Sequence, residues 1–139
     1  MTPVETVLAY MDRINNRDPE KVAALMTDDA EFIDSLGGKI AGRANLVKAW
    51  KAYYAICPDY WVEHEEVLGD GKTVAVFGGA GGTIAEGPGD GPGRTPPPRN
   101  KWRVTAAWMA VVEGGLIRKW QVYADNKPVY DILARIAAK

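Results

Sequence analysis

The chain has 139 residues with a formal net charge of -1 at pH 7, and 47% of its residues are hydrophobic. This length predicts one domain, residues 1–139, which can bury a core without disulfides or metals. The charge excludes a basic nucleic-acid-binding protein, and the single Cys57 excludes an intramolecular disulfide. No stretch is typical of a signal peptide or a membrane span, so we expect a cytoplasmic protein without a membrane partner.

The first half of the chain predicts helices and one short strand. Apolar residues at helical spacing predict a helix over residues 3–16. Asp18 and Pro19 predict the N-cap and first position of a short second helix, whose apolar stripe is Val22, Leu25 and Met26. Residues 30–34 follow as a strand, and a third helix is predicted over residues 43–56.

In the second half the apolar pattern changes to the alternation of strands. The predicted strands span residues 60–68, 73–84, 101–112 and 116–125, and a last helix begins near Asn126 and Pro128. This order predicts an α+β fold with helices on one face of a curved, mostly antiparallel sheet. Glycines inside the strand over residues 73–84 fit strong curvature.

Three glycine-containing stretches need a separate interpretation. Gly78 to Gly82 matches no phosphate-binding fingerprint, and Gly71 to Thr73 is a hairpin turn, because Glu66 stands where a P-loop requires its first glycine. Residues 86–100 are rich in proline and glycine and predict a flexible loop without regular structure. This loop is either a lid over a pocket or an insertion.

Few residues carry chemistry. The only serine, Ser35, lacks the strained setting of a nucleophile, so a Ser-His-Asp triad with His64 is not supported. His64 lies in the charged sequence EHEE and is expected in solvent, and no spacing supports a zinc site. Five tryptophans and six tyrosines suit an apolar small-molecule pocket, and they suit an ordinary core or a dimer interface equally well.

Asp34, in the sequence AEFIDSLGG, directly follows an apolar run. A carboxylate there is either the working group of a pocket or a cap of the turn over residues 35–38. In a pocket, desolvation would raise the pKa of Asp34 above its ordinary value, and the carboxyl could transfer a proton on a bound substrate. Asp125 has the same two interpretations, as a pocket acid or as a cap of the last helix.

Two stretches resemble the nuclear transport factor 2-like superfamily, in its SnoaL-like polyketide cyclase and ketosteroid isomerase-like branch. The first is YMDRINNRDPEKVAALMTDDAEFID and the second is WRVTAAWMAVVEGGLIRKWQVYAD. The resemblance implies a conical half-barrel, in which three N-terminal helices and one C-terminal helix enclose a cavity against the sheet. Members of this superfamily commonly pair through the outer face of the sheet.

The resemblance also implies roles for single residues. Asp34 lies where ketosteroid isomerases keep their general base, and Tyr10 lies where they keep the tyrosine that hydrogen-bonds the enolate. The position of their third group, a neutral acid, is held here by Ala107 or Trp108, so half of the oxyanion hole is missing. Related epoxide hydrolases need an Arg-x-Asp that the corresponding stretch VAVFGGAGG lacks.

These observations lead to two function hypotheses. The first is an isomerase or cyclase in which the catalytic residues Asp34, Tyr10 and Asp125 transfer a proton on an apolar substrate, with no metal or organic cofactor. The second is a non-catalytic domain that binds a small apolar ligand or dimerises. The candidate pocket residues are Trp50, Tyr54, Trp61, Trp108, Trp120 and Tyr123. A homodimer is expected because both faces of the last two strands carry large apolar groups, and an apolar outer face should not stay exposed on a soluble monomer. The residues concerned are Trp102, Trp108, Trp120, Val104 and Val122.

Overall fold

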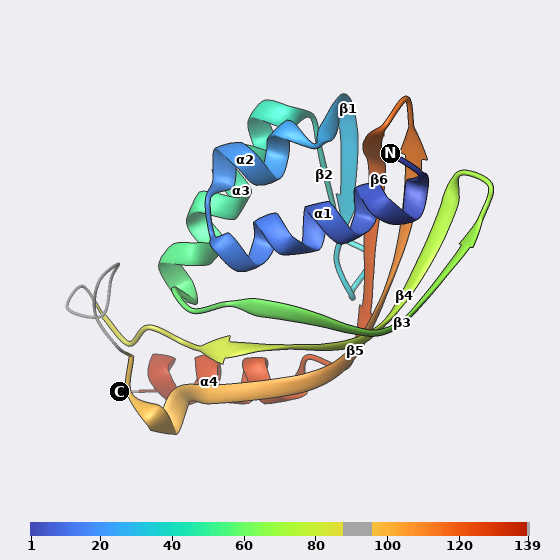
Figure 1. Cartoon of the computed structure of the whole chain (residues 1–139). Helices are drawn as coiled ribbons and strands as arrows, with labels where there is room; N and C mark the ends of the chain where they lie inside the picture. The colour runs from blue at the N-terminus through green and yellow to red at the C-terminus, as the bar shows by residue number, and fades with distance from the viewer. Residues whose placement is uncertain (88–95, 139) are drawn as a thin grey trace.

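The computed structural model describes residues 1–87 and 96–138 and contains one curved sheet with helices on its concave face (Figure 1). The six strands are ordered β2-β1-β6-β5-β4-β3, and every neighbouring pair is antiparallel except β1 and β6. The strands are β1 (Met26–Ile33), β2 (Lys39–Ala41), β3 (Trp61–Asp70), β4 (Thr73–Thr83), β5 (Lys101–Glu113) and β6 (Leu116–Ala124). The α+β half-barrel predicted from the sequence is confirmed.

The helices are α1 (Pro3–Asn16), α2 (Pro19–Ala24), α3 (Arg43–Ile56), α4 (Lys127–Ala137) and the short 3-10 helix η2 (Pro98–Asn100). Helix α1 begins with a capping box, in which the Thr2 hydroxyl accepts from the Glu5 N–H and the Glu5 carboxylate accepts from the Thr2 N–H. Asp18 caps α2, as predicted. Figure 1 shows α1, α2 and α3 together on one side, and α4 beside the first half of β5.

The inward-facing side chains of the central strands form the core. Alternate residues of β5 are buried between the sheet and the helices: Trp102, Val104, Ala106, Trp108, Ala110 and Val112. Trp120 from β6 stacks on Trp108, with ring centroids 5.9 Å apart. Val7, Tyr10, Met11 and Ile14 bring the apolar stripe of α1 onto this layer.

Glycines let β3 and β4 bend sharply. A Cβ on Gly78 would lie 2.0 Å from the Glu63 carbonyl oxygen, next to the point where the β3–β4 register shifts between His64 and Glu66. A Cβ on Gly82 would lie 2.3 Å from the Cys57 sulfur. Only glycine permits backbones to approach this closely, which explains the glycine-rich sequence of β4.

The structure corrects three local predictions. Helix α2 is short, ending at Ala24, so Met26 belongs to β1 and pairs with Ile117 instead of extending the stripe of a helix. The short strand β2 was not predicted, because three exposed residues carry no apolar pattern. Residues 98–100 form η2 rather than irregular loop, and the Asn100 side chain donates to the Ile84 carbonyl at 3.0 Å.

The predicted loop over residues 86–100 and the absence of a predicted membrane span can also be compared with the structure. The rest of the proposed lid, residues 88–95, lies outside the described residues. Within residues 1–87 and 96–138, none of the helices has the length and apolar character needed to cross a membrane.

Candidate ligand-binding cavity

A cavity of about 350 Å³ opens between the concave face of the sheet, α3 and α4. Nineteen of its 22 lining residues are apolar or aromatic. The aliphatic ones are Ile40, Leu46, Ala49, Ile56, Ala80, Ile84, Val104, Ala106, Val122, Ala124, Val129 and Leu133. Seven aromatic residues complete the apolar lining: Phe32, Trp50, Tyr53, Tyr60, Trp102, Trp108 and Tyr130. Both the volume and the chemistry are typical of a small-molecule site.

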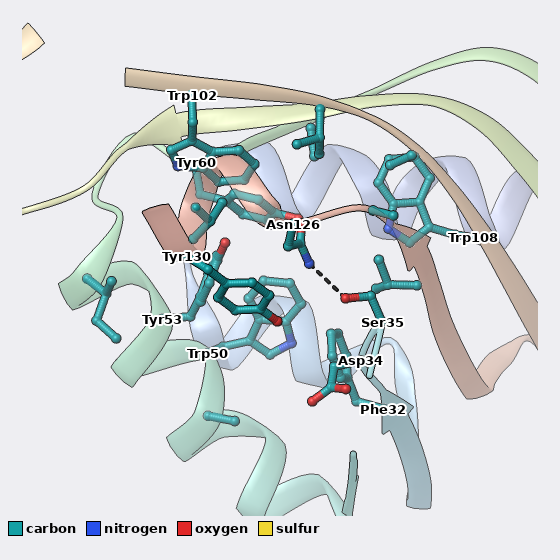
Figure 2. Close-up of a pocket in the computed structure, with 18 of the residues that line it drawn as sticks. Phe32, Asp34, Ser35, Trp50, Tyr53, Tyr60, Trp102, Trp108, Asn126 and Tyr130 are labelled. Atoms are coloured by element: carbon teal, nitrogen blue, oxygen red, sulfur yellow. Dashed lines mark hydrogen bonds between the residues drawn. The ribbon is translucent and has the colours of Figure 1, made fainter. Parts of the chain in front are cut away.

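The aromatic side chains support one another. Trp50 from α3 lies edge-to-face against Phe32 at 6.0 Å, and Tyr53 lies edge-to-face against Tyr60 at 4.8 Å. Tyr60 stacks on Trp102 at 6.1 Å. In Figure 2 these two rings lie at the opposite end of the view from Asp34 and Phe32. Mutually packed rings give this side of the cavity a fixed shape.

The half-buried Tyr53 and Tyr60 are neutral donors. Burial raises the pKa of Tyr53 and of Tyr60 well above the ordinary value of 10.0. Desolvation disfavours the phenolate, so both groups keep their protons at physiological pH. Each hydroxyl can therefore donate a hydrogen bond to a polar atom of a ligand.

Three polar side chains line the cavity: Asp34, Ser35 and Asn126. The Asp34 side chain is exposed, and its Oδ1 accepts the backbone N–H groups of Leu36 and Gly38, each at 2.9 Å. The Asn126 amide donates to the Ser35 hydroxyl at 2.9 Å, which is the dashed line in Figure 2. Asp34 is thus both the cap of its turn and a lining residue.

The parallel pairing of β1 with β6 explains why these polar residues meet. Ile33 is paired with Gln121, so the carboxyl ends of β1 and β6 lie at the same edge of the sheet. The turn after β1 carries Asp34 and Ser35, and the N-cap of α4 after β6 is Asn126. The Asn126 side chain makes no capping bond to its own helix and bonds Ser35 instead.

Sequence comparison places the chain in a known family. Residues 7–120 match the SnoaL-like domain. The chain belongs to the SnoaL-like domain family. Among curated proteins, none matches the sequence.

Solved structures share this SnoaL-like fold at low sequence identity. A Catenulispora acidiphila protein with a ketosteroid isomerase-like fold, solved in complex with trimethylamine, has a TM-score of 0.76 and 21% identity, covering 93% of this chain and 91% of that one. An epoxide hydrolase of M. tuberculosis has a TM-score of 0.73 and 18% identity, covering 98% and 92%. A Xanthomonas campestris protein assigned as a polyketide cyclase has a TM-score of 0.77 and 15% identity, covering 96% of both chains. At these identities the likeness establishes the nuclear transport factor 2-like fold alone.

The SnoaL-like cavity receives only one of the three predicted catalytic side chains, Asp34. The Tyr10 hydroxyl is fully buried behind the lining and donates to the Met26 sulfur at 3.5 Å. The Asp125 carboxylate is exposed and accepts the Lys127 N–H at 3.0 Å, which is a contact of a helix cap. The predicted convergence of these three side chains, and the predicted burial of Asp34, are not found.

Among the predicted pocket residues, Trp50 and Trp108 line the cavity. Tyr54 is directed to α1, where its hydroxyl donates to the Ile14 carbonyl at 2.8 Å, and Trp120 is packed between Trp108 and Tyr10. Trp61 lies under the Arg103 guanidinium at 5.1 Å, and Tyr123 is 52% exposed. Strand alternation places the side chains of Trp61 and Tyr123 on the outer face of the sheet.

Sequence reasoning missed Asn126, Tyr130 and the polar role of Ser35. Asn126 was assigned to a helix start, and nothing local reveals that its side chain turns to a residue 91 positions away. The predicted last helix could have indicated this side of the cavity. Its apolar stripe includes Val129 and Leu133, and such a stripe is expected to pack against the sheet or to line a cavity. Within the described residues, no cluster of three His, Cys, Asp or Glu side chains could hold a metal ion.

Proposed function

We propose that this protein binds a small, largely apolar molecule in the cavity between the sheet, α3 and α4. The observation that carries the proposal is the composition of the described lining, residues 88–95 excluded, in which only Asp34, Ser35 and Asn126 interrupt an apolar and aromatic surface. Burial of a ligand against such a surface provides the free energy, and the few polar groups orient it. The Catenulispora acidiphila structure, a complex with trimethylamine, is one case of a protein of this fold with a small ligand.

A binding assay with a filled cavity tests this proposal. The probe is 2-acetylnaphthalene, an uncharged aromatic ketone, and the signal is quenching of tryptophan fluorescence, because Trp50, Trp102 and Trp108 line the cavity. Ala49→Phe on α3 should fill the cavity and weaken binding at least about tenfold, about 1.4 kcal/mol. Ala52→Phe on the same helix is the matched control, because Ala52 is exposed and does not line the cavity. Equal affinity of the two variants would refute the proposal.

Proton transfer by Asp34 is the second candidate function, and one observation favours it. Within the part of the chain that the structure describes, Asp34 is the only carboxylate that lines the cavity. The carboxylate would take a proton from the carbon beside a substrate carbonyl, while Asn126 or a neutral tyrosine donates a hydrogen bond to the enolate oxygen. Return of the proton to a different carbon would complete an isomerisation of the kind that ketosteroid isomerases catalyse.

Deuterium exchange separates catalysis from binding. In D₂O, the native protein should speed exchange of the methyl protons of 2-acetylnaphthalene, and Asp34→Asn should remove this acceleration without removing binding. If both proteins exchange the ketone at the uncatalysed rate while still binding it, the catalytic candidate fails and the binding proposal stands.

A further inference from the structure

We propose that the cavity selects a ligand that carries a positively charged amine on an apolar body, with the ammonium group held at Asp34. This inference rests on the proposed binding function and adds the chemical class of the ligand. Among the lining residues within 1–87 and 96–138, Asp34 is the only charged one, so this described part of the lining carries a negative formal charge. Figure 2 shows its carboxylate at the same end of the cavity as Phe32 and Trp50.

Three basic side chains on the elements that adjoin the Asp34 turn have other partners. Lys39 from β2 forms an ion pair with Glu31 at 3.5 Å, and Arg43 from α3 pairs with Asp28 at 3.0 Å while donating to the Met26 carbonyl. Lys127 from α4 pairs with Asp131 at 2.7 Å. Within residues 1–87 and 96–138, no ion pair is formed by Asp34. An anionic ligand would therefore meet an uncompensated negative charge, whereas an ammonium group would neutralise it.

The turn holds the carboxylate in place for an incoming cation. The backbone N–H groups of Leu36 and Gly38 both bond Oδ1, and in the described residues no hydrogen bond is recorded for Oδ2. A Cβ on Gly38 would lie 2.6 Å from Oδ2, so the side chain is packed directly against this glycine. An oxygen that is fixed and free of backbone partners loses little entropy when it binds an ammonium group.

The aromatic lining favours an alkylated ammonium group over a bare one. The negatively polarised ring faces of tryptophan and tyrosine attract cations. Methyl groups on the nitrogen weaken its hydration and contact the apolar lining, so a tertiary or quaternary amine is less costly to move from water into the cavity. Trp50, Tyr53 and Tyr130 supply rings on the side from which α3 and α4 enclose the cavity.

Three probes of one shape test the inference: phenyltrimethylammonium, its uncharged carbon counterpart tert-butylbenzene, and benzenesulfonate as the anion. We expect the cation to bind at least about tenfold more tightly than the uncharged probe, and the anion to bind most weakly. Asp34→Asn keeps an oxygen that can accept the two backbone N–H groups, and it should reduce affinity for the cation alone. Asp12→Asn on α1 removes the same charge from an exposed site and should change neither affinity.

The outcomes separate the two proposals. If tert-butylbenzene binds as tightly as the cation, or if Asp34→Asn leaves the cation affinity unchanged, the cation preference is wrong and the binding function stands. If none of the three probes binds, the proposed function fails as well. Should Asp34→Asn not fold, titrations of the native protein from 20 to 500 mM NaCl decide the question. Cation affinity must then fall with salt while that of the uncharged probe does not.

Discussion

Asp34 combines two duties that the sequence left as alternatives. It caps its turn through Oδ1 and it lines the cavity. The local sequence cannot separate the two, because a turn with glycine at positions 37 and 38 calls for a capping carboxylate whether or not a cavity lies beside it. The contribution of the capping contacts to the free energy of unfolding can be measured without a ligand.

Asp34→Ala should lower the free energy of unfolding by about 1 kcal/mol, because the N–H groups of Leu36 and Gly38 lose their acceptor. Asp34→Asn should cost less, since its amide oxygen can accept the same two bonds. Urea denaturation at pH 7 measures both values. A more stable Asn variant would mean that the charge itself is unfavourable in the folded state, contrary to a capping role.

Cys57 is a second residue whose environment predicts a measurable property. Its thiol is fully buried, and burial, followed by the Asp59 carboxylate 3.8 Å away, raises its pKa from 9.0 to about 12. The folded protein therefore binds more protons than the unfolded chain between these values, so this group reduces stability as the pH rises from 9 to 12.

We expect iodoacetamide at pH 8 to label Cys57 at least about 100-fold more slowly in the native protein than in 8 M urea. Cys57→Ala should reduce the decrease in the free energy of unfolding between pH 9 and 12. Part of the decrease should remain, because buried tyrosines also have raised pKa values. Labelling at equal rates in native and urea-unfolded protein would show that the thiol is accessible, against the burial seen here.

At the scale of elements, Asn15 joins α1 to the edge of the sheet. Its side-chain amide donates to the Val62 carbonyl at 2.8 Å, and its oxygen accepts the Val62 N–H at 2.7 Å. Strand β3 is the last strand of the sheet, so these backbone groups have no strand neighbour on that side. The Asn15 side chain thus takes the place of a missing strand at one residue of the edge.

Asn15→Ala should lower the free energy of unfolding by about 2 kcal/mol, since two part-buried backbone groups lose their partners. Asn16→Ala is the matched control, because Asn16 is the adjacent, exposed residue of the same helix, and it should change stability by less than about 0.5 kcal/mol. Equal effects of the two substitutions would show that helix propensity, and not the contact with β3, determines the loss.

Elements with a strong local pattern were predicted with their observed bounds. Helices α1 and α3 span the predicted residues 3–16 and 43–56, because their apolar spacing and proline signals are local. Strand β1 was predicted too short. It begins at Met26, which pairs with Ile117, and continues through the polar residues Thr27, Asp28 and Asp29, where the register with β6 shifts and no apolar alternation marks a strand. A short stretch of sequence does not predict which distant strands will pair. The polar end of the cavity depends on such a pairing, that of β1 with β6.

At the scale of the whole molecule, the outer face of the sheet carries apolar side chains that the helices do not cover. Phe77, Ala107 and Tyr123 are aligned across β4, β5 and β6, and Phe77 is 45% exposed and Tyr123 52%. Leu68, 54% exposed, is paired with Ala75 beside this row. The expected dimer was argued from other residues: Trp102, Trp108, Trp120 and Val104 are buried in the core, and Val122 lines the cavity.

We predict that a second copy of the chain covers this outer face, because a soluble protein rarely leaves an apolar row of this kind in water. Sedimentation velocity at 10 μM should show a dimer, and Phe77→Glu should convert it to a monomer by burying a charge in the interface. Leu36→Glu alters a more exposed apolar residue, 78% against 45% for Phe77, in the turn after β1 and should leave the dimer intact. A native monomer at this concentration would refute the prediction.

The position of β6 has a consequence for folding while the chain is being synthesised on the ribosome. The strand lies between β1 and β5, yet it is the last of the six strands of this sheet to be synthesised. Until residues 116–124 have been synthesised, β1 and β5 each expose an unpaired edge to other nascent chains. A stop codon between the end of β5 at Glu113 and the start of β6 at Leu116 would therefore leave two unpaired strand edges instead of a smaller folded core. We expect such truncated products to aggregate or to be degraded in the cell rather than to persist as partly active fragments.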